Sequence, residues 1–230
     1  MKKIDINFDF RQDSSCGDPD TDSRKLYDAH KLLWNKMLPC GKTFDLEVTR
    51  AGRLLIKNNL GDNLSSDRMC PHFDGLYKGK FDGWLPDTDK EELKYKVRTI
   101  GGHIVFPAHN RNGFTINQAR GVNNIICDRF DLTLECIRRF YKKEKSPLYD
   151  AIRRYKDFFD LFVDFRGYVD FFMLQDFIDE KEQINFSLPF DNFNRSPLPQ
   201  TIDEYKKYTS QTIDLMNSRN KRILESQIMN

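Results

Sequence analysis

The chain has 230 residues, of which 39% are hydrophobic and 31% are charged, a balance typical of a globular protein with one substantial core. Its 37 Lys and Arg against 35 Asp and Glu give a formal net charge of +2, which argues against nucleic acid and against an anionic membrane as partners. No run approaches the roughly 18 apolar residues of a membrane helix, and no apolar stretch follows the N-terminal lysines as in a signal peptide. We therefore expect a single soluble domain over residues 1–230.

The five cysteines are an odd number, lie far apart and form no Cys-x-x-Cys pair, which favours a reducing cytoplasm over a disulfide framework. The nearest approach to zinc-ligand spacing is Cys70-Pro71-His72, and it lacks a second pair, so no metal site is predicted there. The sequence contains neither GxGxxG nor GxxxxGK[ST], and neither GxSxG nor HExxH. We therefore expect no cofactor, and no specific reaction is indicated.

Residues 4–10 alternate apolar and polar side chains, which predicts a half-buried strand. A helix is expected over residues 23–37, because apolar residues recur there at helical spacing and Pro39 follows. His30 lies at the edge of this apolar stripe. A packed imidazole is the ordinary interpretation, and a ligand-binding or catalytic role is the alternative.

Asp18, Asp20 and Asp22 have the i, i+2, i+4 spacing with which a calcium loop begins. The rest of that pattern is missing, since Ser23 stands at the sixth position and Ala29 at the twelfth. The alternative is that these acidic side chains lie at a helix N-terminus and complement its dipole. Whether this loop binds a cation is left open.

Residues 57–92 are expected to form a long loop, either a flexible insertion or an active-site lid, because Gly, Pro, Lys and Asp recur without a period. The stretch Leu64-Ser65-Ser66-Asp67-Arg68 inside it offers hydroxyls and charges but no repeat. A strand follows over residues 96–107, where Gly101-Gly102 indicates a bulge or a close backbone approach. Asn112-Gly113 favours a turn, so residues 114–116 are expected to return as the second strand of a hairpin.

Three long helices are predicted to form the core. Asn117 caps the first, which runs to Lys143, although Gly121 and the Asn pair after it could divide this helix. The second runs from Pro147 to Asp179 with a break at Gly167, and the third from Ile202 to about Asn217, beyond which the chain is expected to fray from residue 218. With a short strand over residues 184–190, this predicts an α+β fold of long helices packed on a small, mostly antiparallel sheet.

Polar residues concentrate at residues 101–120, where the expected hairpin leads into a helix. A helix N-terminus with free N–H groups beside an Arg suits a phosphate or a carboxylate. His103, Asn117 and Arg120 are therefore the candidate ligand-binding residues. The alternative is an ordinary hairpin, in which Arg120 pairs with a structural carboxylate.

Asp128 and Asp164 are candidate general bases for a ligand held by Arg120. Charged residues within an aromatic-rich segment are either paired or line a cleft, because an unpaired buried charge costs several kcal/mol. A catalytic role requires the break at Gly167 to face the hairpin, and simple ion pairing is the alternative.

The chain resembles a family of bacterial proteins of similar length, known as a domain of unknown function, in the segments GGHIVFP, TINQARG and DRFDLTLECIRRFY. The resemblance is strong over residues 97–190 and weaker near the N-terminus, in FDFRQDS and HKLLWNKMLPCGKTFDL. It implies a cytoplasmic bacterial protein, and it brings no activity, cofactor or catalytic residue.

Two functional hypotheses follow. In the first, the protein binds a phosphorylated small molecule or a nucleotide at residues 101–120, as a binding protein or an enzyme. In the second, it is a non-enzymatic protein-interaction or regulatory module, and the polar residues are structural. A pocket lined by His103, Asn117 and Arg120 would favour the first, whereas side chains consumed in contacts with each other would favour the second.

Overall fold

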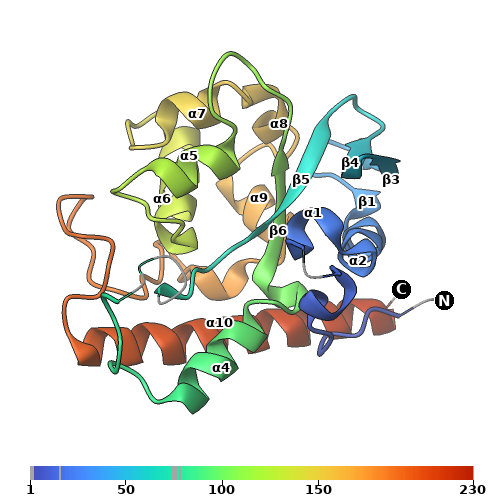
Figure 1. The fold of residues 1–230 in the computed structure, drawn as a ribbon. Helices are drawn as coiled ribbons and strands as arrows, with labels where there is room; N and C mark the ends of the chain where they lie inside the picture. The colour runs from blue at the N-terminus through green and yellow to red at the C-terminus, as the bar shows by residue number, and fades with distance from the viewer. Residues whose placement is uncertain (1–2, 16, 74–76, 78, 230) are drawn as a thin grey trace.

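The computed structural model describes residues 3–15, 17–73, 77 and 79–229, and it has the predicted α+β fold (Figure 1). An antiparallel sheet of four strands lies between the N-terminal helices on one side and helices α5 to α9 on the other. The long helix α10 crosses the base of both, with α4 beside it. No helix in the described ranges has the length and apolar character to cross a membrane.

The sheet has the strand order β3-β4-β5-β6, with β3 at Leu46–Ala51, β4 at Arg53–Asn58, β5 at Asn63–Arg68 and β6 at His103–Pro107. In the β5–β6 pair, Ser66 lies opposite Val105 and Arg68 opposite His103. Facing residues of an antiparallel pair project to the same side of the sheet, so Arg68 and His103 share one face. A separate ribbon pairs β1, Lys36–Met37, with β2, Thr43–Phe44.

The helices are mostly short. In chain order they are η1 Phe10–Asp13, α1 Pro19–Asp22, α2 Arg24–Trp34, α4 Asp87–Lys96, η2 Ile100–Gly102, α5 Ile116–Val122, α6 Phe130–Tyr141, α7 Tyr149–Arg153, α8 Lys156–Asp160, α9 Phe165–Phe171, η3 Gln175–Phe177 and α10 Ile202–Met229.

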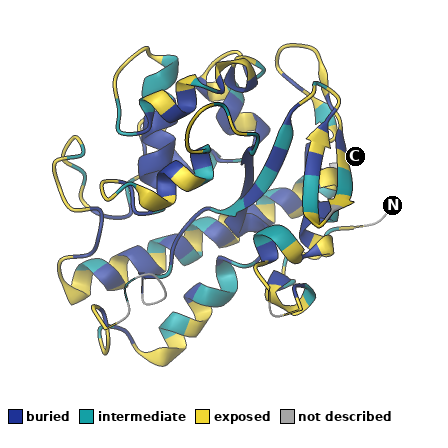
Figure 2. Cartoon of the chain, turned by 45° about the horizontal axis from the view of Figure 1, so that its top comes forward, coloured by how far each residue is buried: buried dark blue, intermediate teal, exposed yellow. Residues whose placement is uncertain are grey.

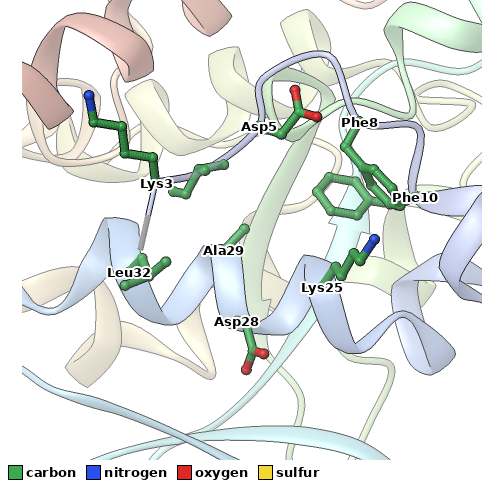
Figure 3. A pocket seen from close by; sticks show the side chains of 9 residues that line it. Lys3, Asp5, Phe8, Phe10, Lys25, Asp28, Ala29 and Leu32 are labelled. Atoms are coloured by element: carbon green, nitrogen blue, oxygen red, sulfur yellow. The ribbon is translucent and has the colours of Figure 1, made fainter. Parts of the chain in front are cut away.

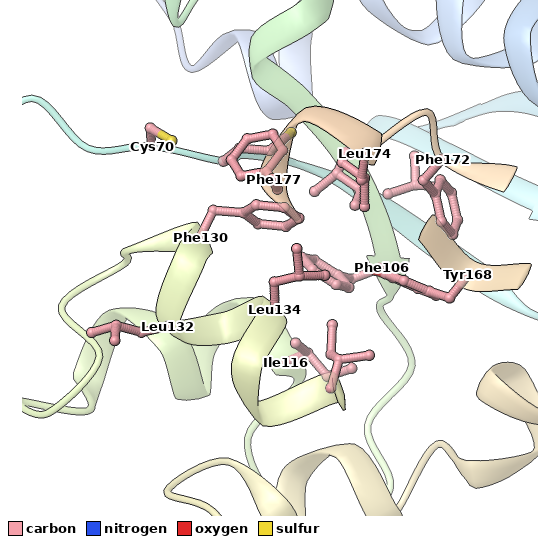
Figure 4. Packing of buried hydrophobic residues seen from close by; sticks show 14 of the residues in the cluster. Cys70, Phe106, Ile116, Phe130, Leu132, Leu134, Tyr168, Phe172, Leu174 and Phe177 are labelled. Atoms are coloured by element: carbon pink, nitrogen blue, oxygen red, sulfur yellow. The ribbon is translucent and has the colours of Figure 1, made fainter. Parts of the chain in front are cut away.

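The core lies between β6 and helices α6 and α9. All five residues of β6 and the first two turns of α6 are buried, as Figure 2 shows. Phe106 of β6 points between Leu134 of α6 and Tyr168 of α9, and the ring of Phe130 packs edge-on against that of Phe177 with centroids 5.2 Å apart (Figure 4). Interlocking aromatic rings therefore join the helical half to the sheet.

The predicted hairpin over residues 96–116 is wrong. Strand β6 pairs with β5 instead, and residues 114–116 do not form a strand. The reason is local: the Thr115 hydroxyl accepts from the Gln118 backbone N–H, and the Gln118 side chain accepts from the Thr115 N–H, so a capping box starts α5 at Ile116. Thr115, not Asn117, caps this helix.

Two other predicted strands do not form. Burial alternates only over residues 4–8, and the chain is not extended there, because it turns at residues 6–7, where Phe8 N–H donates to the Asp5 carbonyl at 3.3 Å. Phe10 then begins η1. Residues 184–190 contribute only the isolated bridge between Ile178 and Ile184.

The helical half is more broken than predicted. The first long helix is divided into α5 and α6, because Cys127 and Asp128 both adopt the left-handed conformation, with φ of 47° and 59°. Residues 147–179 form α7, α8, α9 and η3 instead of one long helix with a break at Gly167, which lies inside α9. Helix α10 continues to Met229, so the predicted fraying from residue 218 is wrong. The predicted loop over residues 57–92 contains β5 and the first part of α4.

The close backbone approach predicted at Gly101-Gly102 is present. A Cβ on Gly102 would lie 2.3 Å from the Val97 carbonyl oxygen, and one on Gly101 would lie 2.6 Å from Asn220 Oδ1. Gly101 N–H donates to that same Asn220 oxygen at 2.8 Å, and the buried Arg219 donates to the Gly101 carbonyl at 2.8 Å. Helix α10 therefore fixes the turn that leads into His103.

Candidate functional site

Strand β5 carries polar side chains on both faces, which is unusual for an interior strand. Ser66 and Arg68 point toward α1 and α2, whereas Ser65 and Asp67 point toward α5. Two polar clusters therefore lie back to back across the sheet. We call them the Asp20 cluster (Asp20, His30, Ser66, Arg98, His103) and the Arg120 cluster (Asp67, Asn117, Arg120, Asp128, Thr133).

A directed chain of hydrogen bonds crosses the Asp20 cluster. Trp34 Nε1 donates to His30 Nδ1 at 3.1 Å, so the proton of a neutral His30 is on Nε2, which lies 2.9 Å from Ser66 Oγ. Ser66 Oγ in turn donates to Asp20 Oδ1 at 3.2 Å. Burial lowers the pKa of His30 well below its ordinary value. With both nitrogens occupied, His30 has no lone pair to take the Ser66 proton, which argues against a serine nucleophile.

His103 faces Asp20 from the other side. Its Nδ1 lies 2.9 Å from the Thr99 carbonyl oxygen, which can only accept, so Nδ1 carries the proton of the neutral ring. Nε2 lies 3.4 Å from Asp20 Oδ1, and this nitrogen has no hydrogen-bond partner in the described part of the chain. Burial lowers the pKa of His103, although Asp20 acts in the opposite direction. Two acceptors therefore face each other without the proton that a hydrogen bond between them would require.

Arg98 forms the edge of the cluster toward solvent. Its side chain is 16% exposed, and its Nη1 lies 3.9 Å from the nearest carboxylate oxygens of Asp18 and Asp20. That atom is buried and has no hydrogen-bond partner among residues 3–15, 17–73, 77 and 79–229. Burial lowers the pKa of Arg98, and the like charge of Arg68 lowers it further. The same two arginines also help burial to lower the pKa of His72 to about 4.

The Arg120 cluster has a different character. Arg120 is fully buried; its Nε donates to Thr133 Oγ1 at 2.9 Å and its Nη1 to the Asp67 carboxylate. Its Nη2 donates to the carbonyls of Met69 and Asp128, at 3.0 and 2.8 Å. All three nitrogens are therefore used within the protein, and Arg120 has no donor left for a ligand.

The predicted site residues do not all meet. Asn117 and Arg120 lie together on α5, and Asn117 Nδ2 donates to Ser65 Oγ at 2.9 Å. His103 lies on the opposite face of the sheet. Asp128 contributes its backbone carbonyl to Arg120, and the exposed Asp164 caps α9 by accepting from Gly167 N–H at 2.7 Å.

The carboxylate with the most perturbed pKa is one that the sequence did not single out. Burial raises the pKa of Asp67 to about 7, and Arg120 acts against this rise. Asp20, Ser66 and Arg98 were likewise missed as a group. The signal in the sequence that could have indicated this group is the polar run of residues 63–68. Such a run can form an interior strand only if both faces of the strand contact polar partners.

The three acidic residues at 18, 20 and 22 diverge. Asp18 caps α1 by accepting from Asp20 N–H, whereas the Asp20 carboxylate turns inward to Ser66. Across the described residues, no group of three or more His, Cys, Asp and Glu side chains could hold a metal ion. The structure therefore agrees with the alternative interpretation, in which these acidic residues lie at the N-terminus of a helix, here α1.

An apolar pocket of about 250 Å³ lies beside the Asp20 cluster, between residues 3–10 and α2 (Figure 3). The rings of Phe8 and Phe10 and the side chains of Ala29 and Leu32 line it, and charged side chains lie around them. The Phe10 ring also packs edge-on against His103, with centroids 5.6 Å apart. One aromatic ring therefore separates this pocket from the cluster.

These features define an α+β protein in which one interior strand serves two polar clusters. Arg98 Nη1 and His103 Nε2 lack partners on one face. On the other face every nitrogen of Arg120 has an acceptor, although the buried Asn117 Oδ1 has no donor among the described residues. The chain belongs to the family of unknown function DUF6994, whose model matches residues 4–223. This confirms the resemblance to a domain of unknown function. No curated protein and no solved structure matches the chain.

Acid is expected to destabilise the protein through its buried histidines. Burial lowers the pKa values of His30, His72 and His103 below their ordinary 6.5, so on unfolding below that pH each ring takes up a proton. The stability that these neutral rings contribute is present above pH 6.5 and is lost as the pH falls. Asp67 acts in the opposite direction, because its raised pKa means that its carboxyl holds a proton in the folded protein and releases it on unfolding over this pH range. We expect the free energy of unfolding to fall by roughly 1.4 kcal/mol per pH unit for each net proton.

Urea denaturation at constant ionic strength between pH 7 and 4.5 measures this slope. His30→Gln removes one titrating ring and should reduce the slope by about one proton. An unchanged slope in this variant would contradict the assignment of His30 as a neutral buried ring.

Proposed function

We propose that the protein binds a phosphate-containing small molecule, such as a sugar phosphate or a nucleotide, at the Arg98 edge of the Asp20 cluster. This keeps the ligand class expected from the sequence but moves the site across the sheet from Arg120, which lacks a free donor. His103 is the one predicted ligand-binding residue that belongs to the new site.

The observation that carries the proposal is the Nη1 atom of Arg98, which is buried and has no hydrogen-bond partner in the described part of the chain. A buried arginine N–H without an acceptor is unfavourable, and a planar guanidinium matches two oxygens of a phosphate. Arg68 adds a second positive charge on the same face as His103, and the carboxylates of Asp18 and Asp20 lie beyond hydrogen-bond reach of Arg98 Nη1. A tetrahedral dianion between the two arginines would supply the missing acceptors.

The Asp20–His103 pair suggests what lies next to the phosphate. Both of the facing atoms are acceptors, so a hydroxyl or an amine of the ligand would donate to them. A sugar hydroxyl adjacent to the phosphate has this chemistry. The same proposal places the protein in the cytoplasm, because the four described cysteines are free thiols.

A thermal-shift and calorimetric titration with inorganic phosphate, nucleotides and sugar phosphates tests the proposal. A ligand that binds the folded state raises the melting temperature. We expect phosphate to do so against chloride of equal ionic strength, and Arg98→Met to weaken the affinity by roughly ten-fold or more, since charge-assisted hydrogen bonds contribute about 1.5–3 kcal/mol each.

Arg166→Met is the matched control, because Arg166 is exposed on α9 and forms an ordinary ion pair with Asp170 at 3.0 Å. It should leave the phosphate affinity unchanged. No stabilisation by any of these anions, or equal binding by the Arg98 variant, would contradict the proposal and favour the second hypothesis, a protein-interaction module.

A further inference from the structure

Two hollows lie along helix α10, and neither is lined by a residue of the Asp20 cluster or of the Arg120 cluster. The first has a volume of about 240 Å³ and lies between α4 and α10, where it is lined by Asp89, Glu92, Thr209 and Ile213 among others. The second, of about 770 Å³, lies between α10 and residues 175–187. Asp214 lines both hollows, and we refer to the two together as the groove across α10; α4 lies beside α10 in Figure 1.

The charge of this groove is negative. Asp89, Glu92 and Asp214 line the first hollow, with Lys206 as the opposing charge. In the second hollow, Asp176 is already paired with Arg222 at 2.9 Å. Neither Glu92 nor Asp214 forms an ion pair with a described residue. The groove therefore has carboxylate charge that the protein itself leaves unbalanced.

Buried polar atoms in both hollows also lack hydrogen-bond partners, and this observation does not depend on the charge of the groove. Thr209 lines the first hollow, is 3% exposed, and its Oγ1 has no hydrogen-bond partner in the described chain. In the second hollow, Gln175 Nε2 donates to the Asp170 carboxylate at 2.9 Å, which fixes Oε1 as the other atom of the amide. That Oε1 is buried without a donor, as is Gln211 Oε1. These atoms call for a ligand that donates hydrogen bonds.

The spacing favours an organic cation over a metal ion. No three carboxylate, His or Cys side chains of the described residues are close enough together to hold a metal. Apolar side chains also line the groove, namely Ile213 in the first hollow and Leu215 and Phe186 in the second. Ammonium groups joined by methylene chains match this mixed lining, because the ammonium donates to oxygens and the methylenes pack on apolar surface.

We propose that the groove across α10 binds a linear polyamine, with Asp214 at its centre and Thr209 and Gln175 accepting hydrogen bonds on either side. This site is independent of the phosphate site, from which it differs in charge and in the elements that form it.

Isothermal titration with spermidine at physiological ionic strength tests the inference. We expect binding that Mg²⁺ or NaCl of equal ionic strength does not reproduce, and that Asp214→Asn weakens by roughly five-fold, the effect of removing one partly exposed charge pair. Glu225→Gln is the matched control, since Glu225 is an exposed acid on the same helix, 4.0 Å from Lys221 and outside both hollows. It should bind spermidine as the wild type does.

Because Asp214 is exposed, its variant should fold, and an unchanged melting temperature without ligand verifies this. The inference is overturned if spermidine does not bind, if Mg²⁺ competes at equal ionic strength, or if Asp214→Asn binds normally. Binding of a lysine-rich peptide in the absence of spermidine binding would also overturn it, in favour of a protein partner.

Discussion

Replacement of Arg120 by Met is expected to lower the free energy of unfolding by about 3–5 kcal/mol, the usual result of removing one partner from a buried ion pair. The side chain is fully buried and joins β5, through Asp67, to the loop at Asp128 and to Thr133 on α6. Its loss would leave the Asp67 carboxylate without a cation and the carbonyl of Asp128 without a donor. Urea denaturation at pH 8 measures the effect.

Two comparisons make this prediction specific. Arg166→Met, which breaks an exposed pair with Asp170, should cost about 1 kcal/mol or less. Adding Asp67→Asn to the Arg120 variant should restore part of the loss, because it removes the uncompensated charge. The loss should also be smaller at pH 5 than at pH 8, since the Asp67 carboxyl, whose pKa burial already raises, would then be protonated. Equal losses at both pH values would contradict the assigned role of Asp67.

The regular parts of this fold follow from local patterns. The apolar stripe of α2 and the period of α6 each predict a helix where one forms, and the Gly101-Gly102 pair predicts the close approach that the structure has. The division between α5 and α6 was harder to predict, because the two residues with left-handed backbone there are Cys127 and Asp128. Neither is a glycine, the residue that usually indicates such a turn in a sequence. Their conformation brings the Asp128 carbonyl to Arg120, which is a tertiary requirement.

Strand pairing could not be read from the sequence. Residues 114–116 are the nearest apolar partner for β6 along the chain, so local reasoning predicts a hairpin. The true partner, β5, lies in a stretch without alternation, since Ser66 and Asp67 contact polar residues on opposite faces. A strand that serves two polar clusters loses the hydrophobic period by which strands are recognised.

The candidate site was hidden for a related reason. Asp20 and Ser66 are 46 residues apart in sequence, and His30 and Ser66 are 36 apart, so no motif spacing connects them. Sequence reasoning did find polar chemistry near His103 and Arg120. It could not tell an arginine whose donors are all used from one with a donor to spare, because the acceptors of Arg120 include Asp67, 53 residues away.

Gly102→Ala is expected to lower the free energy of unfolding by about 3 kcal/mol, at the upper end of the usual cost of overpacking. The added Cβ would lie 2.3 Å from the Val97 carbonyl oxygen, a backbone atom that cannot rotate away. Relief requires η2 to move, and η2 leads directly into His103. Spectroscopic unfolding in urea measures the loss, and a weaker phosphate affinity in the same variant would follow if His103 borders the phosphate site.

Gly121→Ala is the matched control for this substitution. In α5 the nearest atoms to its added Cβ are the Asp128 carboxylate oxygens at 3.8 Å, an ordinary contact, and the backbone is helical. Alanine should therefore stabilise the protein by about 0.5–1 kcal/mol, since it restricts the unfolded chain more than glycine does. Opposite signs for the two substitutions would locate the steric constraint at the turn before His103. A loss at Gly102 no larger than the effect at Gly121 would mean that this turn can move, and with it the histidine that faces Asp20.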